Sequence, residues 1–350
     1  MRVVGIIAEY NPFHYGHLYH LTKSIKETNA DYTIAVMSGQ FTQRGEAAIT
    51  DKWIRAEAAV SCGVDLVLEI PVVYALQTAE IFAYGGIQLL NHTGIVTHIC
   101  FGSETGDLNI LQKIADILLE ENNRYKELLK NYLDKGLSYP AARYHGILDY
   151  INLTYDKSLY NEDLRVIKKA LSGSNSILAI EYLKSLKLTN SSIIPVTIPR
   201  IKSSYNDTKI KKGISSATSI RREILKNGMS NKVRNALPEK VFNILSDAFD
   251  RGLGPIDNNH FDDLFLGLIR RSSTSEIASW MDVGEGLENR IKEQATRATT
   301  IGEFLSFVKT KRYPLTKLQR IIIHGLLNIT TKSFEELNNG NGPAYLRLLA

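Results

Sequence analysis

Residues 3–17 read VVGIIAEYNPFHYGH, and this stretch decides the fold of the chain. The apolar run over residues 3–8 predicts a buried strand. It ends before Asn11-Pro12, which is a turn signal. Apolar positions at Leu18 and Leu21 predict that the chain becomes helical from Gly16 onward. A strand, a tight turn and a helix start therefore follow one another.

Two histidines, His14 and His17, lie one helical turn apart at this predicted helix start. Helix N-termini carry unpaired N–H groups and a partial positive charge, so they attract phosphates. Gly16 lacks a Cβ, which lets a base or a phosphate approach the backbone. Both imidazoles can donate hydrogen bonds to phosphoryl oxygens as charge builds up on them. The residues favour a nucleotide-binding turn.

The triplet His14, His17 and His20 also suggests a metal site. No cysteine or acidic ligand lies at a matching spacing, however, and zinc sites on one helix favour pairs four residues apart. We therefore expect no metal-ligating residues here.

The composition is that of a soluble globular protein. The 350 residues are 44% hydrophobic and 23% charged, enough for two domains and a sizeable core. The two cysteines, Cys62 and Cys100, lie in apolar surroundings, which predicts reduced thiols in a cytoplasmic protein. A strand so close to Met1 leaves no room for a signal peptide, and no run of 18 apolar residues predicts a membrane span.

Alternating strands and helices fill the first half of the chain. Strands are predicted over residues 31–37, 64–70, 98–101 and 192–198, the last of them closing the sheet. Helices are predicted over residues 18–28, 51–61 with Trp53, Ala56 and Val60 on one face, 78–91 and 108–135. This βαβ pattern implies a parallel sheet, in which ligands gather at the carboxyl ends of the strands.

Several polar or small residues follow these strands. Gly102 ends the strand at 98–101 and is a candidate for close approach to a nucleotide. Ser174 or Asn175 is expected to cap a helix. Arg200, at the end of the strand over 192–198, suits a phosphate because its guanidinium is planar and always charged. The polar loop over residues 38–46 lies at the same edge.

Positive charge is concentrated between residues 200 and 240. Eleven basic and three acidic residues give this stretch a balance of +8, against +5 for the whole chain. A nucleic-acid backbone is a natural partner for such a stretch. Beyond Pro238 only helices are predicted. They carry a second basic cluster, with Tyr313 able to stack on a base; its members are Lys309, Lys311, Arg312, Lys317 and Arg320.

The string AEYNPFHYGH over residues 8–17 resembles the tRNA(Met) cytidine acetate ligase family of the HxGH nucleotidyltransferase superfamily. Similar family strings are MSGQFTQRGE at 37–46, FGSE at 101–104 and NSILAIEY at 175–182. ISSATSIR at 214–221 resembles the superfamily's second motif. The resemblance reaches Ala350, where family members are expected to continue. In the family a lysine and a proline precede the asparagine that here is Asn175, and Gly173-Ser174 replace them.

The resemblance implies a Rossmann-like nucleotidyltransferase domain with a parallel sheet over residues 1–225. An all-helical domain that contacts tRNA would follow over 226–350. It also implies that His14 and His17 are catalytic and that ATP, with Mg²⁺, is the cosubstrate. The residues expected to bind ATP are Ile7, Ala8, Glu9, Tyr10, Asn11, Pro12, Phe13, His14, Tyr15, Gly16, His17, Gly102, Asn175, Arg200, Ser216 and Arg221.

The family's activity implies a ligase that forms acetyl-adenylate from acetate and ATP. The acetyl group would pass to N4 of the wobble cytidine of elongator tRNA(Met), giving N4-acetylcytidine. No membrane or protein partner is expected. Two alternatives remain open at this point: an adenylyltransferase that makes a small-molecule cofactor, and a tRNA-binding module with a vestigial ATP site.

Overall fold

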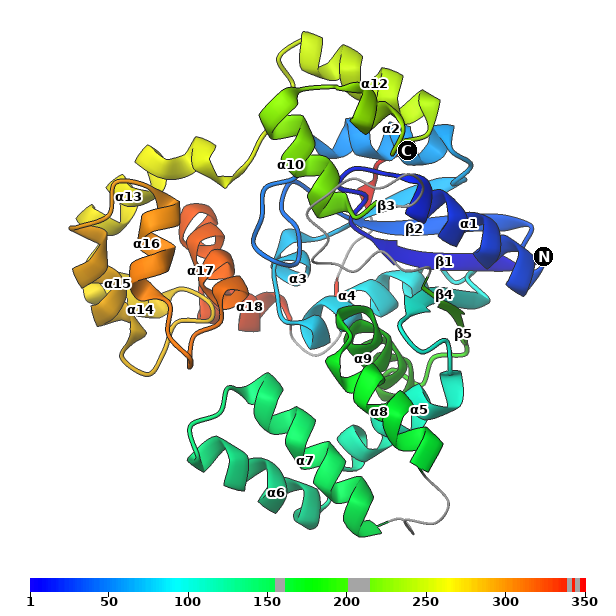
Figure 1. Ribbon diagram of the computed structural model, residues 1–350, viewed down its shortest axis with the longest axis horizontal. Helices are drawn as coiled ribbons and strands as arrows, with labels where there is room; N and C mark the ends of the chain where they lie inside the picture. The colour runs from blue at the N-terminus through cyan, green and yellow to red at the C-terminus, as the bar shows by residue number, and fades with distance from the viewer. Residues whose placement is uncertain (155–160, 201–214, 339–341, 344–346) are drawn as a thin grey trace.

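A six-stranded sheet covered by helices on both faces is the centre of the computed structural model (Figure 1). The structure describes residues 1–154, 161–200, 215–338, 342–343 and 347–350. The strand order is β5-β4-β1-β2-β3-β6. The strands are β1 Val3–Ala8, β2 Tyr32–Ser38, β3 Leu66–Ile70, β4 His98–Ser103, β5 Ile194–Pro199 and β6 Arg347–Leu348. Strands β1 to β5 are mutually parallel, which confirms the predicted α/β fold.

The prediction that residues 192–198 form the last strand is wrong. The short strand β6 pairs antiparallel with β3, where Leu348 is the partner of Leu68. Two residues are too few to show the alternation by which a strand is recognised in a sequence.

Helices α1, α2 and α10 to α12 cover one face of the sheet. Their bounds are α1 Tyr15–Thr28, α2 Lys52–Ser61, α10 Ala217–Asn227, α11 Asn231–Arg234 and α12 Glu239–Asp250. A single hydrophobic cluster joins Ile6 and Ala35 of the sheet to Ile220 of α10 and Phe242 of α12. The proposed division of the chain between residues 225 and 226 stays a prediction, and helices on both sides of it pack in this cluster.

Helices α3 to α9 lie on the opposite side, where α4 and α9 contact the sheet and the pair of α6 and α7 lies farther out (Figure 1). Their bounds are α3 Val72–Ala75, α4 Ala79–His92, α5 Leu108–Glu120, α6 Asn123–Asp134, α7 Tyr139–Thr154, α8 Asn161–Ser172 and α9 Ser174–Leu188. Helix α4 tolerates Gly85 and Gly86 because it packs very closely. A Cβ on Gly85 would lie 2.6 Å from the side chain of Tyr74, and one on Gly86 would lie 2.6 Å from that of Ile7.

Two helix predictions need correction. The region predicted as one helix over 108–135 is divided at Glu121, whose φ is +38°, and Asn122 caps α6 by accepting a hydrogen bond from the N–H of Tyr125. The predicted apolar face of α2 is also wrong, because Trp53 is 52% exposed. The buried face consists of Ile54, Arg55 and short alanines, which let α2 lie close to the sheet.

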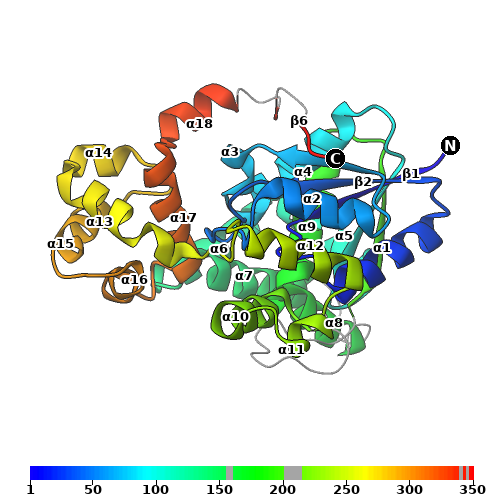
Figure 2. The ribbon, with the colours of Figure 1, turned by 90° about the horizontal axis from the view of Figure 1, so that it is seen from above.

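The C-terminal helices pack around a core of their own beside the sheet (Figure 2). They are the 3₁₀ helix η2 Asn258–Phe261, α13 Asp262–Arg271, α14 Thr274–Ser279, α15 Leu287–Ala295, α16 Ile301–Val308, α17 Leu315–Leu327 and α18 Thr331–Leu337. Leu76, which ends α3, is part of that core. The Nε2 of His324 on α17 also lies 2.7 Å from the carbonyl oxygen of Leu76. The predicted helical C-terminal region is confirmed, although α18 was not predicted.

In the part of the chain that the structure describes, no helix combines the length and apolar character needed to cross a bilayer.

Candidate active site

The turn between β1 and α1 is held by its own histidines. His14 is the N-cap of α1, and its Nδ1 accepts a hydrogen bond of 2.9 Å from the N–H of Gly16. The Nδ1 of His17 accepts a hydrogen bond of 3.3 Å from the N–H of His14. The two rings are stacked with centroids 3.9 Å apart. Histidine thus takes the place that Ser and Glu occupy in the usual capping box.

These hydrogen bonds fix the tautomer of both rings. A nitrogen that accepts a backbone N–H carries no proton in a neutral imidazole, so the proton of each ring lies on Nε2. Burial, reinforced by the charges of Arg200 and Arg221, lowers the pKa of His14 to about 3. Burial, with His14, His20 and Arg200, also lowers the pKa of His17 well below its ordinary value. At neutral pH both rings are uncharged and each has one N–H to donate.

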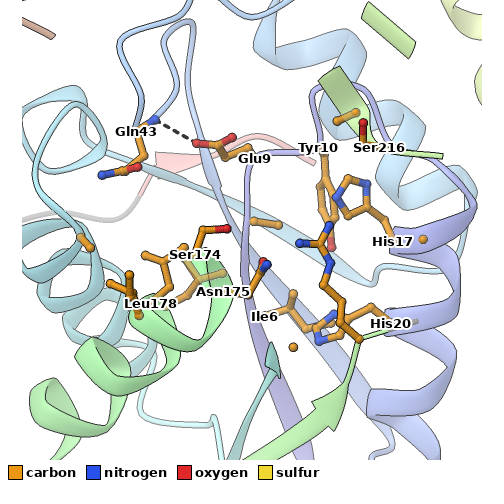
Figure 3. A pocket seen from close by; sticks show the side chains of 18 of the residues that line it. Ile6, Glu9, Tyr10, His17, His20, Gln43, Ser174, Asn175, Leu178 and Ser216 are labelled. Carbon is orange, nitrogen blue, oxygen red and sulfur yellow. Dashed lines mark hydrogen bonds between the residues drawn. The ribbon is translucent and has the colours of Figure 1, made fainter. Parts of the chain in front are cut away.

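A cavity of about 440 Å³ opens beside this turn, a volume typical of a small-ligand site (Figure 3). It lies at the carboxyl ends of β1, β4 and β5, as ligand sites of parallel sheets do. Its wall comes from distant parts of the chain and consists of Ile6, Ile7, Ala8, Glu9, Tyr10, His14, Gly16, His17, Tyr19, His20, Gln43, Arg44, Ala79, Phe82, Gly102, Ser174, Asn175, Ile177, Leu178, Tyr182, Ile198, Pro199, Arg200, Ser216, Ala217, Thr316 and Arg320.

The end of β4 and the start of α9 are fastened together by Glu104. Its carboxylate accepts hydrogen bonds from the backbone N–H and side-chain Nδ2 of Asn175, at 3.2 and 2.7 Å. It also accepts from the backbone N–H and Oγ of Ser176, both at 2.7 Å. Burial alone would raise the pKa of Glu104, but these hydrogen bonds hold it below its ordinary value. Glu104 therefore fixes Asn175 at the cavity wall.

The prediction that Ser174 or Asn175 caps α9 is wrong. The N-cap is Gly173, which has no side chain to accept the free N–H groups. The carboxylate of Glu104 takes that role from outside the helix. A Cβ on Gly173 would collide with this carboxylate, so a side chain at this position would displace Glu104.

Gly102 lies on β4 and Arg200 directly follows β5, and both line the cavity wall. The nearest protein atom to a Cβ on Gly102 would be the carbonyl oxygen of Ile198, at 4.0 Å. Packing alone therefore does not require glycine here, and a Cβ would have only open space around it. The backbone N–H of Arg200 donates to the carbonyl oxygen of Ser103 at 2.9 Å, which fixes the end of β5 against β4.

Comparison with known proteins decides the family. A sequence model of the HIGH nucleotidyl transferase family matches residues 1–350. The tRNA(Met) cytidine acetate ligase of Alkaliphilus metalliredigens is 43% identical over 350 residues, which are 100% of this chain and 82% of that protein. The corresponding ligase of Caldanaerobacter subterraneus subsp. tengcongensis is 46% identical over 349 residues, covering 100% of this chain and 83% of the relative.

The chain belongs to the tRNA(Met) cytidine acetate ligase family. The resemblance noted in the sequence is confirmed. Two crystal structures of Thermotoga maritima TmcAL have the same fold at 38% identity and cover 99% of this chain and 80% of theirs. The apo form gives a TM-score of 0.92, and the form bound with alpha-thio ATP gives 0.90.

Most residues predicted to bind ATP line the cavity, although the binding itself stays a prediction. They are Ile7, Ala8, Glu9, Tyr10, His14, Gly16, His17, Gly102, Asn175, Arg200 and Ser216. Ser216 is also the N-cap of α10, where its Oγ accepts from the N–H of Ser219. The role of Ser216 as a helix N-cap is therefore compatible with its predicted role in binding ATP.

Five predicted residues lie outside the cavity wall: Asn11, Pro12, Phe13, Tyr15 and Arg221. Asn11 is buried and accepts a hydrogen bond from the N–H of Ile49. The guanidinium of Arg221 donates to the carbonyl oxygen of Asn11 at 2.9 Å and pairs with Glu46 at 2.6 Å. Asn11 and Arg221 hold the turn through these contacts, and the predicted contacts of all five residues with ATP stay predictions.

The structure describes only part of the predicted basic stretch. Lys202, Lys209, Lys211 and Lys212 lie outside the described residues, as does Ile214 of the second motif. Tyr313 is only 9% exposed, since it packs in the core of the C-terminal helices and Lys317 lies over its ring. The proposed stacking of Tyr313 on a base is therefore wrong for this conformation.

Sequence reasoning missed two kinds of residue. Thr316 and Arg320 of α17 line the cavity although they lie in the predicted tRNA-contact region.

Arg55 is fully buried on α2, where it donates to the carbonyl oxygens of Glu9 at 2.5 Å, of Ser38 at 2.8 Å and of Gly39. It ties the ends of β1 and β2 together. Its signal in the sequence was an arginine between Ile54 and Ala56, inside an alanine-rich helix.

Proposed function

We propose that this protein is an ATP-dependent ligase that acetylates the wobble cytidine of elongator tRNA(Met). Acetate and ATP would give acetyl-adenylate and pyrophosphate, and N4 of the cytidine would take the acetyl group. The support comes from relatives named tRNA(Met) cytidine acetate ligase and from a TmcAL structure bound with alpha-thio ATP. A tRNA substrate would place the protein in the cytoplasm.

The observation that carries the proposal is the pair of neutral imidazoles at the start of α1. In the first step an acetate oxygen attacks the α-phosphorus of ATP, and the bond to pyrophosphate breaks. Negative charge grows on the phosphoryl oxygens, where the Nε2–H groups of His14 and His17 would donate. Because both rings are neutral and fixed by backbone hydrogen bonds, they need no reorganisation as the charge develops.

Arg200 would meet the outer phosphates, since it lines the cavity and carries a permanent charge. Arg221 is proposed for the same phosphates, which would require it to leave its pair with Glu46. Asn175 and Gly102 would seat the nucleoside. Among the described residues no group of three or more His, Cys, Asp or Glu side chains could hold a metal ion. Mg²⁺ is proposed to enter with the phosphates of ATP, whose charge it neutralises.

The second substrate must bring a cytosine out of its stack to reach an adenylate in this cavity. The positive balance of residues 200–240 would attract the tRNA backbone. The C-terminal helices would hold the anticodon arm, and Arg320 would lie where the two substrates meet, because it lines the same cavity as His17.

The test is a direct assay of the modified nucleoside. The protein is incubated with ATP, labelled acetate and bulk tRNA, and the tRNA is then digested to nucleosides. We expect labelled N4-acetylcytidine and pyrophosphate release that depends on acetate. An adenylyltransferase would need a phosphorylated cosubstrate instead, and a vestigial site would release no pyrophosphate.

Two variants make the assay specific. His17→Ala is expected to abolish turnover without loss of the fold, because His17 is partly exposed at the cavity wall. Lys23→Ala on the exposed side of α1 is the matched control and should remain active. Retained activity in His17→Ala would remove this residue from the mechanism.

A further inference from the structure

Glu9 is the one carboxylate among the described residues that line the cavity. It directly follows β1, and its Oε1 accepts a hydrogen bond of 2.9 Å from the N–H of Gln43 (Figure 3). The described residues donate no hydrogen bond to its Oε2. The side chain of Gln43 is itself held by the carbonyl oxygen of Gln77 at 2.6 Å. One carboxylate oxygen of Glu9, Oε1, is thus held by Gln43, and the other, Oε2, can accept a hydrogen bond from a ligand.

The surroundings of Glu9 are mixed in charge. Burial raises the pKa of Glu9, although the hydrogen bond from Gln43 and nearby arginines oppose this. The charged and titratable groups that face it come from the loop between β2 and α2, from α2, from α9 and from α10, and they are Arg44, Glu46, Arg55, Tyr182 and Arg221. The guanidinium of Arg55 also donates a hydrogen bond to the backbone carbonyl oxygen of Glu9. A carboxyl group in such a site can exchange a proton closer to neutral pH than an exposed one.

The reacting groups of the first half-reaction do not suit this carboxylate, although Glu9 is one of the residues predicted to bind ATP. Acetate and the phosphates of ATP are anionic, and two unit charges 4 Å apart repel by roughly 4 kcal/mol near a protein surface. A carboxylate that faces the cavity therefore suits a ligand group that donates hydrogen bonds. The exocyclic amine of cytosine is such a group, and Glu or Asp is its usual side-chain acceptor.

Other proton acceptors at the cavity are excluded by their hydrogen bonds or charge. The only lone-pair nitrogens of His14 and His17 already accept backbone N–H groups. Burial, with the charge of Arg200, lowers the pKa of His20 to about 4, so it is a weak base. Burial raises the pKa of the phenols of Tyr10 and Tyr182, which therefore stay protonated.

We propose that Glu9 accepts the hydrogen bond of the cytidine N4 amine and takes its proton during acetyl transfer. The amine nitrogen forms a bond to the acetyl carbon, the bond from that carbon to the phosphate oxygen breaks, and AMP leaves with the electron pair. The proton lost by the nitrogen goes to Oε2 of Glu9. This inference rests on the proposed function and assigns Glu9 to its second step, as a catalytic residue.

The test measures the two half-reactions separately in the 350-residue chain. Acetate-dependent exchange of pyrophosphate into ATP reports the first step. Single-turnover transfer from synthetic acetyl-adenylate to tRNA reports the second. The variants are Glu9→Gln, which keeps the shape, and Glu9→Asp, which keeps the carboxylate. Glu57→Gln, an exposed position on α2 outside the cavity, is the control for a changed charge.

We expect Glu9→Gln to slow transfer by about 100-fold or more, the usual effect of losing a general base, while exchange stays within about threefold of the parent. Glu9→Asp should recover part of the transfer rate. The parent's transfer rate should fall as acidic pH protonates Glu9, and Glu9→Gln should lack this dependence.

Three results would overturn the inference while the parent remains active in both assays. They are unchanged transfer in Glu9→Gln, exchange that falls as much as transfer, and an acidic limb of the pH profile that survives the substitution. A parent protein that shows neither exchange nor transfer would instead refute the proposed function, and this inference with it.

Discussion

Replacing Glu104 with glutamine should loosen α9 and weaken nucleotide binding at the same time. The carboxylate of Glu104 accepts four hydrogen bonds, two from Asn175 and two from Ser176. Glutamine has one acceptor oxygen, and its NH₂ group would face two of the four donors where the second oxygen was. Up to two of the four bonds are therefore lost.

The magnitude follows from the type of bond. Hydrogen bonds to a charged acceptor contribute about 1.5–3 kcal/mol each, so two would give about 3–6 kcal/mol. Glu104 is partly exposed, and water can replace some of what is lost. We therefore expect Glu104→Gln to lower the free energy of unfolding by about 2–3 kcal/mol. If half of that appears as misplacement of Asn175, the affinity for ATP should fall about tenfold.

The assays are urea denaturation followed by circular dichroism and calorimetric titration with ATP. Glu127→Gln, an exposed position on α6, is the matched control and should change neither quantity. The stability difference must also depend on pH. Because the folded-state pKa of Glu104 is lowered from its ordinary 4.5, its contribution is fully present above that value. It is lost as pH falls through the lowered folded-state pKa.

Two outcomes would refute this reasoning. One is a variant as stable as the parent at pH 7, which would mean that the four hydrogen bonds make no net contribution to the free energy of unfolding. The other is a stability difference that persists at acidic pH, because the parent's Glu104 would then be protonated and could no longer be the source of it.

Three further substitutions test other parts of the structure. Arg55→Met leaves three carbonyl oxygens at the ends of β1 and β2 without their donor and should cost about 3 kcal/mol or more in urea denaturation; an unchanged midpoint would contradict this. His14→Asn keeps an N-cap acceptor but loses Nε2–H, so pyrophosphate exchange should fall about 100-fold with little change in melting temperature. Gly45→Ala, at φ +77° and against the backbone N of Arg320, should cost about 1–3 kcal/mol and expose α17 to limited proteolysis.

Much of the sheet could be predicted because its signals are local. The run over residues 3–8 is buried along most of its length, and a continuous apolar segment before a turn predicts such a strand. The helix after it begins at Tyr15, three residues before the predicted helix over 18–28, because the cap is a histidine rather than one of the usual small polar residues. The motif of residues 14–17 still identified the turn.

What could not be predicted depends on partners far away in the chain. Glu104 caps α9 across a separation of 71 residues, and no local sequence pattern predicts such a hydrogen bond. Arg55 looks like a solvent-exposed charge until the ends of two strands surround it. Trp53, by contrast, looks like a core residue and is exposed, because alanines allow the tighter packing of α2 on the sheet.

The shared wall of the cavity has a thermodynamic consequence. Residues of α1 and β1 form one part of it, and Thr316 and Arg320 of α17 form another. A ligand that contacts both parts strengthens the attachment of the C-terminal helices to the sheet. By reciprocity, that attachment strengthens ligand binding by the same free energy. A truncated chain without α17 would therefore bind the ligand more weakly, even though every residue of the motif at 8–17 is still present.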